Sequence, residues 1–243
     1  MESTAFLILC IVVVMAAGFV QGLTSFGFAL IAMPFLAKMI PFQEAVPIVV
    51  MLSLCTNLMV ITGAWRHVDL KKIWILILSS LLAAPVGAYL LLLLDERLLK
   101  MFTGAFIVLI ALLQLLGRTF PVKNEKLAFV PVGMISGLLN GSISMSGPPV
   151  ALFLSNQRTG KDTFRANITA YAIILNIITI GTYAYGGMLT SSVLTGSLWL
   201  IPSMFVGVLL GIKAIKRLND QWFRKLALWV IMGSGIWTIV STL

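Results

Sequence analysis

Residues 18–34 read GFVQGLTSFGFALIAMP, and residues 133–149 read GMISGLLNGSISMSGPP. Each stretch begins with Gly-x-x-x-Gly-Leu inside an apolar run, continues through glycine and hydroxyl residues, and ends at a proline. Within a lipid bilayer, backbone that departs from the helix is tolerated only where protein or a polar cavity satisfies its N–H and C=O groups. Two matched interruptions therefore predict one polar site that is built from two halves of the molecule.

The composition places the chain in a membrane. Of its 243 residues, 60% are hydrophobic and 10% are charged, and the mean hydropathy is +1.06. Soluble domains carry about 25% charged residues. Apolar runs of about 20 residues, the length needed to cross a bilayer, recur along the whole chain, and no hydrophilic stretch is long enough to fold alone. We predict an all-α polytopic membrane protein with a single membrane domain over residues 1–243.

The apolar segments repeat in two sets of five. Gly18 pairs with Gly133 (115 residues apart), Asn57 with Asn176 (119 apart) and Gly87 with Gly211 (124 apart). Such a slow drift is expected of a duplication, with halves 1–120 and 121–243. We predict that each half is a helical hairpin of two short or re-entrant segments followed by three transmembrane helices. The segments fall at 4–22, 24–40, 43–64, 71–94 and 98–117, and again at 127–139, 143–157, 166–187, 190–212 and 222–242.

The Lys and Arg residues indicate how the segments cross. If each hairpin turns back, fourteen of the 17 basic residues lie on one side, and only Lys38, Arg97 and Lys100 lie on the other. If each hairpin crosses once instead, the split is six to eleven. The positive-inside rule favours the first arrangement. Five crossings per half then make the repeat inverted, with both termini outside. Since the net charge of +9 is a topology signal, no nucleic-acid partner is expected.

The two interruptions carry the residue types that hold an anion. Hydroxyls, amides and the free N–H groups at helix starts donate hydrogen bonds without excess charge. For Gly18 and Gly22 alone, close helix packing is the better explanation. For Asn57 and Asn176, ligand contact and a hydrogen bond between helices both stay open. The predicted substrate-binding residues are Gln21, Thr24, Ser25 and Gly27 in the first break (Gln21–Gly27), Asn140, Ser142, Ser144, Ser146 and Gly147 in the second break (Asn140–Pro149), and Asn57 and Asn176.

The second break is the richer in donors, so we expect the anion there and expect the first break to close the site from the other face. Gln157 and Thr179 are weaker candidates for the same polar lining. Arg158, Lys161 and Arg165 follow the second break, and the sequence favours membrane anchors over an anion-attracting role for them.

Charged residues are missing from the middle of the apolar segments. A buried carboxylate relay of the kind found in pumps is therefore not visible, and proton coupling would have to use Glu44, His67 or the substrate itself. His67 lies in a polar loop, where a solvated side chain is the simpler interpretation. Cys10 and Cys55 have no CxxC or histidine-rich neighbours, so neither a disulfide nor a metal is expected. We predict no metal and no cofactor.

At these residues the sequence resembles the TauE/SafE family of bacterial membrane transporters. The resemblance rests on Gly18-x3-Gly22-Leu23, Ser25-Phe26-Gly27-Phe28 and Pro34, on Gly137-Leu138 and Ser144-Met145-Ser146-Gly147-Pro148-Pro149, and on Arg165. Many members carry consecutive glycines after the first motif, where this chain has Leu23-Thr24-Ser25-Phe26-Gly27. The resemblance implies transport of small, often sulfur-containing or organic anions across the bacterial inner membrane.

These observations favour a secondary transporter over two alternatives. The expected activity is movement of a small anion, such as sulfite, a sulfonate or another organic anion, by alternating access. A passive anion channel is the second hypothesis. A membrane-embedded enzyme is the third and the weakest, because the only histidine is His67 in a loop. The expected partners are the anionic substrate and the lipid bilayer. Coupling to protons or another ion, and assembly into a homo-oligomer, stay open.

Overall fold

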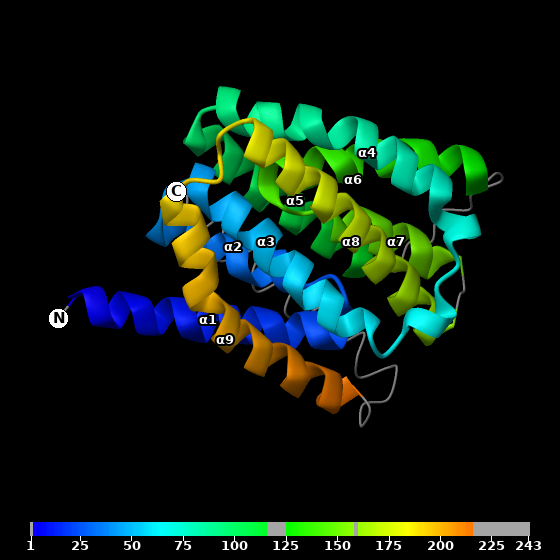
Figure 1. The fold of residues 1–243 in the computed structure, drawn as a ribbon. Coiled ribbons are helices and arrows are strands. Elements are labelled where there is room, and N and C mark those ends of the chain that lie inside the picture. Colours follow the sequence, from blue (N-terminus) through cyan, green and yellow to red (C-terminus); the bar gives the residue numbers. More distant parts are fainter. Residues whose placement is uncertain (1, 116–124, 158–159, 216–243) are drawn as a thin grey trace.

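A computed structural model describes residues 2–115, 125–157 and 160–215 of the chain, and these residues form a bundle of helices without strands (Figure 1). The predicted segment 222–242 lies outside the described residues, as do Arg118, Lys123 and Arg158. The helices are α1 (Glu2–Thr24), α2 (Phe28–Met39), α3 (Phe42–Ile61), α4 (Leu70–Leu93), α5 (Glu96–Leu115), α6 (Glu125–Ile143), α7 (Gly147–Asn156), α8 (Lys161–Tyr185) and α9 (Ser191–Ile215), with a 3-10 turn, η1 (Trp65–His67), before α4.

Six of these helices are long and apolar enough to cross a membrane, namely α1, α3, α4, α6, α8 and α9. The chain is therefore a multi-pass membrane protein. Each predicted hairpin combines one helix of spanning length, α1 with 23 residues or α6 with 19, and one short helix, α2 with 12 or α7 with 10. At 1.5 Å per residue the short helices reach only about 15–18 Å, which is less than the hydrocarbon core of about 30 Å.

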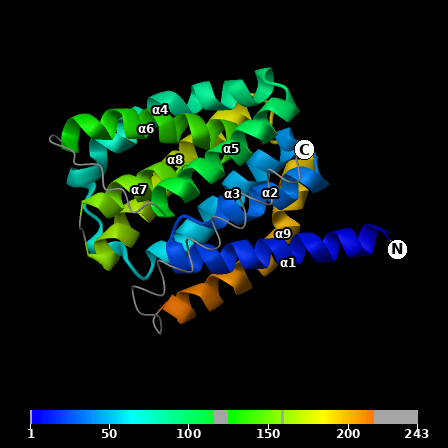
Figure 2. The ribbon, with the colours of Figure 1, turned by 180° about the vertical axis from the view of Figure 1, so that it is seen from behind.

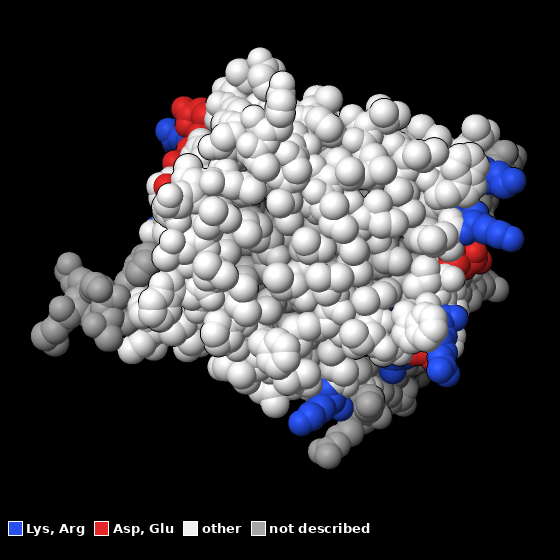
Figure 3. Space-filling model, viewed as in Figure 1, with Lys and Arg blue, Asp and Glu red and all other residues white. Residues whose placement is uncertain are grey.

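Apolar side chains lie on both the inside and the outside of the bundle. Val14, Met33 and Phe42 are fully buried in the core, whereas Leu82 on α4 and Leu198 on α9 are 80% and 66% exposed. A soluble protein would hide such side chains, but in a membrane they contact lipid tails that are as apolar as leucine. The broad middle of the surface in Figure 3 carries no charged side chain.

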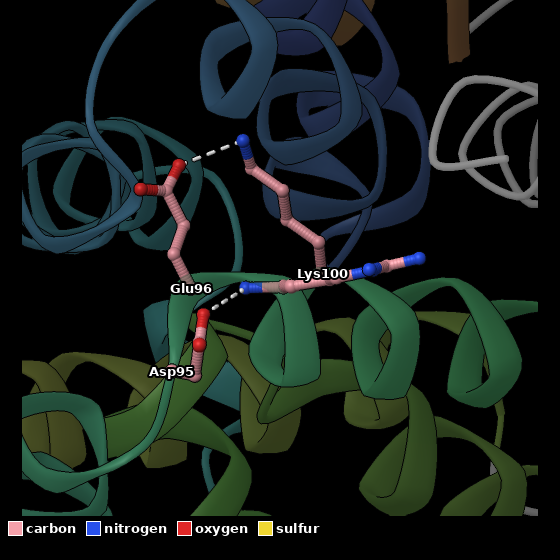
Figure 4. A network of polar contacts seen from close by, with 4 residues as sticks. Asp95, Glu96 and Lys100 are labelled. Carbon is pink, nitrogen blue, oxygen red and sulfur yellow. Dashed lines mark hydrogen bonds and ion pairs between the residues drawn. The ribbon is translucent and has the colours of Figure 1, made fainter.

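The charges lie at the two ends of the bundle (Figure 3). The start of α1 and the turn between α4 and α5 lie at one end, and the connection from α3 to α4 and the start of α6 lie at the other (Figures 1 and 2). Most of the basic side chains gather at the second end. At the first end, Asp95 accepts a hydrogen bond from the Arg97 N–H (2.9 Å), and Glu96 pairs with Lys100 (2.7 Å; Figure 4). These contacts cap α5 where it meets water.

Glycines bring two pairs of helices into close contact. On α1, a Cβ added at Gly18 would lie 2.7 Å from the Met204 carbonyl of α9, and one at Gly22 would lie 2.9 Å from the Gly211 Cα. On α6, Gly137 and Gly141 meet α4 in the same way, at Ser80, Ala84 and Gly87. Small residues allow backbones to approach this closely in membranes. In the structure, Gly18 and Gly22 serve helix packing, which is the interpretation favoured from the sequence.

The glycine contacts follow a different spacing from the one that the sequence motifs predict. Gly18 and Gly22, which touch α9, lie 119 residues before Gly137 and Gly141, which touch α4. The contact partners of Gly137 and Gly18, Ser80 and Met204, are 124 residues apart. The sequence motifs had paired Gly18 with Gly133, one helical turn earlier. Gly133 instead packs against Ser79, at a position where the first half has Val14. The separation of 119 residues equals that of Asn57 and Asn176.

Candidate anion-binding site

Both breaks have the same backbone conformation at matching positions. Ser25 and Ser144, 119 residues apart, are the two non-glycine residues with positive φ in the described chain, at 69° and 62°. The Ser25 N–H donates to the Gln21 carbonyl (2.7 Å) and the Ser144 N–H to the Asn140 carbonyl (3.1 Å). A left-handed residue at this point ends a helix, as in common C-terminal caps. It therefore stops α1 and α6 and turns the chain into α2 and α7.

The hydroxyl groups of these two serines have no hydrogen-bond partner. Ser25 is 1% exposed and Ser144 is 5% exposed, and neither Oγ atom is paired within the described structure. Buried polar atoms are nearly always paired, so an unpaired one calls for a water, an ion or a ligand. Two such atoms occur here, 119 residues apart in the sequence.

A side-chain amide network supports the first break. Gln21 Nε2 donates to Asn57 Oδ1 (2.9 Å), while Gln21 Oε1 accepts from the Phe28 N–H (2.9 Å) at the start of α2. Asn57 Nδ2 donates in turn to the Ser53 carbonyl (2.7 Å). Gln21 thus bridges α1, α2 and α3 and fixes the course of the chain through the break.

The second break has a matching network. Asn140 Nδ2 donates to Asn176 Oδ1 (3.1 Å) and to Thr179 Oγ1 (2.9 Å), which links α6 to α8. Since Asn140 and Asn176 lie 119 residues after Gln21 and Asn57, the same amide pair occurs twice. The sequence left ligand contact and interhelical bonding open for Asn57 and Asn176. Both side chains bond to another helix and also line a cavity.

The two breaks share one cavity with a volume of about 30 Å³. Of the predicted site residues, it is lined by Gln21, Ser25, Asn57, Asn140, Ser144, Ser146, Gly147 and Asn176. The breaks also contact each other, because a Cβ at Gly147 would lie 2.8 Å from the Phe26 Cβ. Only a residue without a side chain lets α7 start this close to the first break.

Three predicted residues do not line this cavity. The Thr24 hydroxyl donates to the Val20 carbonyl (2.9 Å) and accepts from the Phe26 N–H (3.3 Å). The Ser142 hydroxyl bonds within its own helix, to Leu138 (2.8 Å). Gly27 precedes α2, where a Cβ would lie 2.5 Å from a Val20 methyl group. Thr24 and Gly27 thus shape the turn after α1, and Ser142 bonds within α6.

Seven lining residues were not predicted from the sequence. Ser53 lies four residues before Asn57, and Ala172 and Ile168 lie four and eight residues before Asn176, so the helical period could have found them. Tyr171 donates from its hydroxyl to Ser136 Oγ (2.7 Å), and Ser136 donates to the Ser146 carbonyl (2.7 Å), which fixes the second break. The full set is Phe26, Phe28, Ala29, Ser53, Ile168, Tyr171 and Ala172.

Arg165 is not an interfacial anchor in this structure. Its side chain is 8% exposed, and its guanidinium donates two hydrogen bonds of 3.0 Å, from Nη1 to the Leu23 carbonyl and from Nη2 to the Gly22 carbonyl. The side chain of an anchor would extend into the headgroup region, whereas this one is buried against the end of α1. Lys161, at the start of α8, is partly exposed, as an interfacial residue would be.

The titratable groups considered for coupling or metal binding, His67, Glu44, Cys10 and Cys55, do not line the cavity. His67 is exposed in η1, and Glu44 accepts a hydrogen bond from the Ser192 hydroxyl (2.7 Å) at the surface. Cys10 is buried and Cys55 is half-buried, and both thiols are free. Within residues 2–115, 125–157 and 160–215, no group of three or more His, Cys, Asp or Glu side chains is placed to hold a metal ion.

Comparison with known proteins gave a matching family and a relative. A family model described as "Sulfite exporter TauE/SafE" matches residues 10–238. A protein of Cupriavidus necator, named "Probable sulfite/organosulfonate exporter TauE", is 22% identical over 227 residues, which cover 90% of this chain and 88% of that protein. The comparison with solved structures gave no match.

Proposed function

Since the chain belongs to the sulfite exporter TauE/SafE family, we propose that it is a secondary transporter that moves a small anion across the bacterial inner membrane by alternating access. The family description and the name of the Cupriavidus necator relative favour export, with sulfite or an organosulfonate as cargo. Both also favour transport over catalysis.

The observation that carries this proposal is the small polar cavity between the two breaks. It lies in an otherwise apolar bundle, and two buried serine hydroxyls without partners, Ser25 and Ser144, line it. The helix starts of α2 and α7 lie beside it, at Phe28 and Gly147. Hydroxyl donors and helix N-termini suit an anion. The lining residues carry no formal charge, so recognition would rest on neutral donors.

Alternating access is supported by the two-fold pattern of the chain. In this proposal the repeat is inverted, with halves 1–120 and 121–243 and both termini on the outer side of the inner membrane. The amide pairs, the left-handed serines and the glycine contacts all recur at matching separations. The ends at which α1 and α6 begin are opposite (Figures 1 and 2). Two halves in opposite orientation around one site could exchange their roles, which would open it first to one face and then to the other.

The test is sulfite flux from proteoliposomes that contain the purified protein. Ser25→Ala and Ser144→Ala remove the unpaired hydroxyls, so we expect each to lower the apparent affinity for sulfite about tenfold, the effect of a lost hydrogen bond to a charged group. Gly147→Val should abolish flux, because its side chain would collide with Phe26. Ser155→Ala is the matched control, since the exposed Ser155 hydroxyl bonds only within α7.

Wild-type rates for all three variants would refute the assignment of the site. The same measurement separates a carrier from a passive channel, the second hypothesis. A carrier saturates at low sulfite concentration and is accelerated by sulfite on the opposite side, whereas a channel shows neither behaviour.

A further inference from the structure

Two helix C-termini meet the cavity as well as two helix N-termini. Both α1 and α6 end at the breaks, at Thr24 and Ile143, so their last carbonyl groups lie beside the lining residues Ser25 and Ser144. The C-terminal end of a helix carries a partial negative charge of about half an elementary charge. An anion in the cavity would be repelled by these carbonyls unless hydrogen-bond donors cover them.

At the first break, the donor is Arg165 of α8. Its guanidinium bonds to the carbonyls of Gly22 and Leu23, three and two residues before the left-handed Ser25. Among the described residues Arg165 forms no ion pair. Its positive charge is therefore buried against main-chain carbonyls, next to the segment that carries the unpaired Ser25 hydroxyl.

At the second break, the donor is Tyr183, also of α8. Its hydroxyl donates to the Gly141 carbonyl (2.7 Å), three residues before Ser144, and Tyr183 is fully buried. Gly141 lies 119 residues after Gly22. The same carbonyl of the repeat is therefore covered in both halves, once by a charged donor and once by a neutral one.

A single helix supplies both donors. Arg165 and Tyr183 are 18 residues apart on α8, which corresponds to about 27 Å along a helix. Between them lie Ile168, Ala172 and Asn176, which line the cavity. At the corresponding positions of the first half, the chain has Val46 and Ala64, whose side chains have no hydrogen-bond donor. The arrangement is thus asymmetric within an otherwise repeated structure.

We propose that Arg165 and Tyr183 are positioning residues that hold the two breaks from opposite ends of α8. Arg165 fixes the first break and thereby the Ser25 hydroxyl, and Tyr183 fixes the second break and the Ser144 hydroxyl. By covering the carbonyls, both residues make the cavity tolerant of negative charge. That last role rests on the proposed anion transport, whereas the positioning role does not.

Cysteine labelling tests the positioning without any transport. Ser25→Cys and Ser144→Cys are made separately in a chain with Cys10→Ala and Cys55→Ala, and the rate of reaction with a small methanethiosulfonate is measured. We expect Arg165→Gln to speed labelling at position 25 about tenfold, as for loss of hydrogen bonds from a charged donor, and to leave position 144 unchanged. Tyr183→Phe should speed labelling at position 144, by less than tenfold, and leave position 25 unchanged. Arg165→Lys keeps the charge but presents a single nitrogen, so an intermediate rate is expected.

Equal changes at both positions, or no change at either, would overturn the proposal, because they would indicate general loosening or no role. Protection of the thiols by an alkylsulfonate forms the second arm, because a sulfonate, unlike sulfite, does not react with methanethiosulfonates. We expect Arg165→Gln to raise the sulfonate concentration for half-protection at position 144 as well, through the lost charge, and Arg165→Lys to restore it. Unchanged protection would refute the electrostatic role. If the sulfonate protects no thiol even in the presence of Arg165, the proposed organosulfonate transport fails, while the labelling rates still decide the positioning role.

Discussion

At the scale of single residues, the left-handed serines are the most informative feature of the chain. A non-glycine residue in the left-handed region costs roughly 1–2 kcal/mol, and glycine adopts this conformation without that cost. Ser25 and Ser144 bear this cost and leave their hydroxyls unpaired. Both features are unfavourable for an empty folded protein, and both make sense if the hydroxyls bind a ligand.

Ser144→Gly should therefore stabilise the protein while impairing its function. Glycine relieves the backbone strain, so we expect the free energy of unfolding to rise by about 1 kcal/mol, seen as a higher melting temperature in detergent. Thermal stabilisation by added sulfite should fall, because a donor is lost. Ser203→Gly is the control, since Ser203 lies inside α9. There we expect a loss of about 0.5–1 kcal/mol. A lower melting temperature for Ser144→Gly would show that its hydroxyl stabilises the empty fold.

At the scale of helices, the close contacts of α1 with α9 and of α4 with α6 depend on glycines that touch backbone. Gly207 on α9 packs against the Met15 carbonyl and the Phe19 nitrogen of α1. Backbone cannot move aside as a flexible side chain can, so any added atom has to separate the helices. Gly181 on α8 has nothing within 4 Å of a Cβ.

Gly207→Ala and Gly181→Ala should consequently have opposite effects on stability. We expect Gly207→Ala to lower the free energy of unfolding by about 1–3 kcal/mol, as overpacking does. Gly181→Ala should raise it by about 0.5–1 kcal/mol, because alanine favours the helix. Thermal unfolding followed by tryptophan fluorescence compares the two. Similar shifts in the same direction would mean that the α1 and α9 contact is not as close as described.

The sequence predicted the helices well and the lining of the cavity in part. Hydrophobic runs and the glycine, serine and proline residues of the breaks are local signals, so the ends of most helices and eight of the lining residues could be anticipated. The match in position between Gly18 and Gly137 could not be predicted, because several glycines fit the same short motif. Nor could the bonds of Arg165, since they join residues 142 and 143 positions apart. The position of Arg165 in the chain predicted a membrane anchor, whereas its tertiary contacts bury the side chain against the end of α1.

At the scale of the whole molecule, the two ends of the bundle differ in charge. The end with the α3 to α4 connection carries most of the basic side chains, and the end with the α4 to α5 turn carries Asp95 and Glu96 beside two basic residues (Figures 3 and 4). By the positive-inside rule, we expect the end with the α3 to α4 connection to face the cytoplasm. The proposed orientation then places the start of α1 outside.

Single cysteines at the two ends test this orientation in intact cells. In a chain with Cys10→Ala and Cys55→Ala, we expect Leu94→Cys to react with a membrane-impermeant maleimide. His67→Cys should react only after the inner membrane is permeabilised. Both positions are exposed. The reverse pattern would contradict the orientation. Sulfite flux through the His67→Cys protein should be normal, since His67 is exposed and does not line the cavity.

The small volume of the cavity has a consequence for selectivity. A buried water needs at least about 10–15 Å³, so a cavity of about 30 Å³ has room for about two water molecules. An anion that enters such a space would have to leave much of its hydration shell behind. The affinity for each candidate anion would depend on two free energies. One is the cost of removing its water, and the other is the gain from hydrogen bonds to a few neutral donors. In this state the site would act as a dehydration filter, which disfavours strongly hydrated ions even when their shape fits.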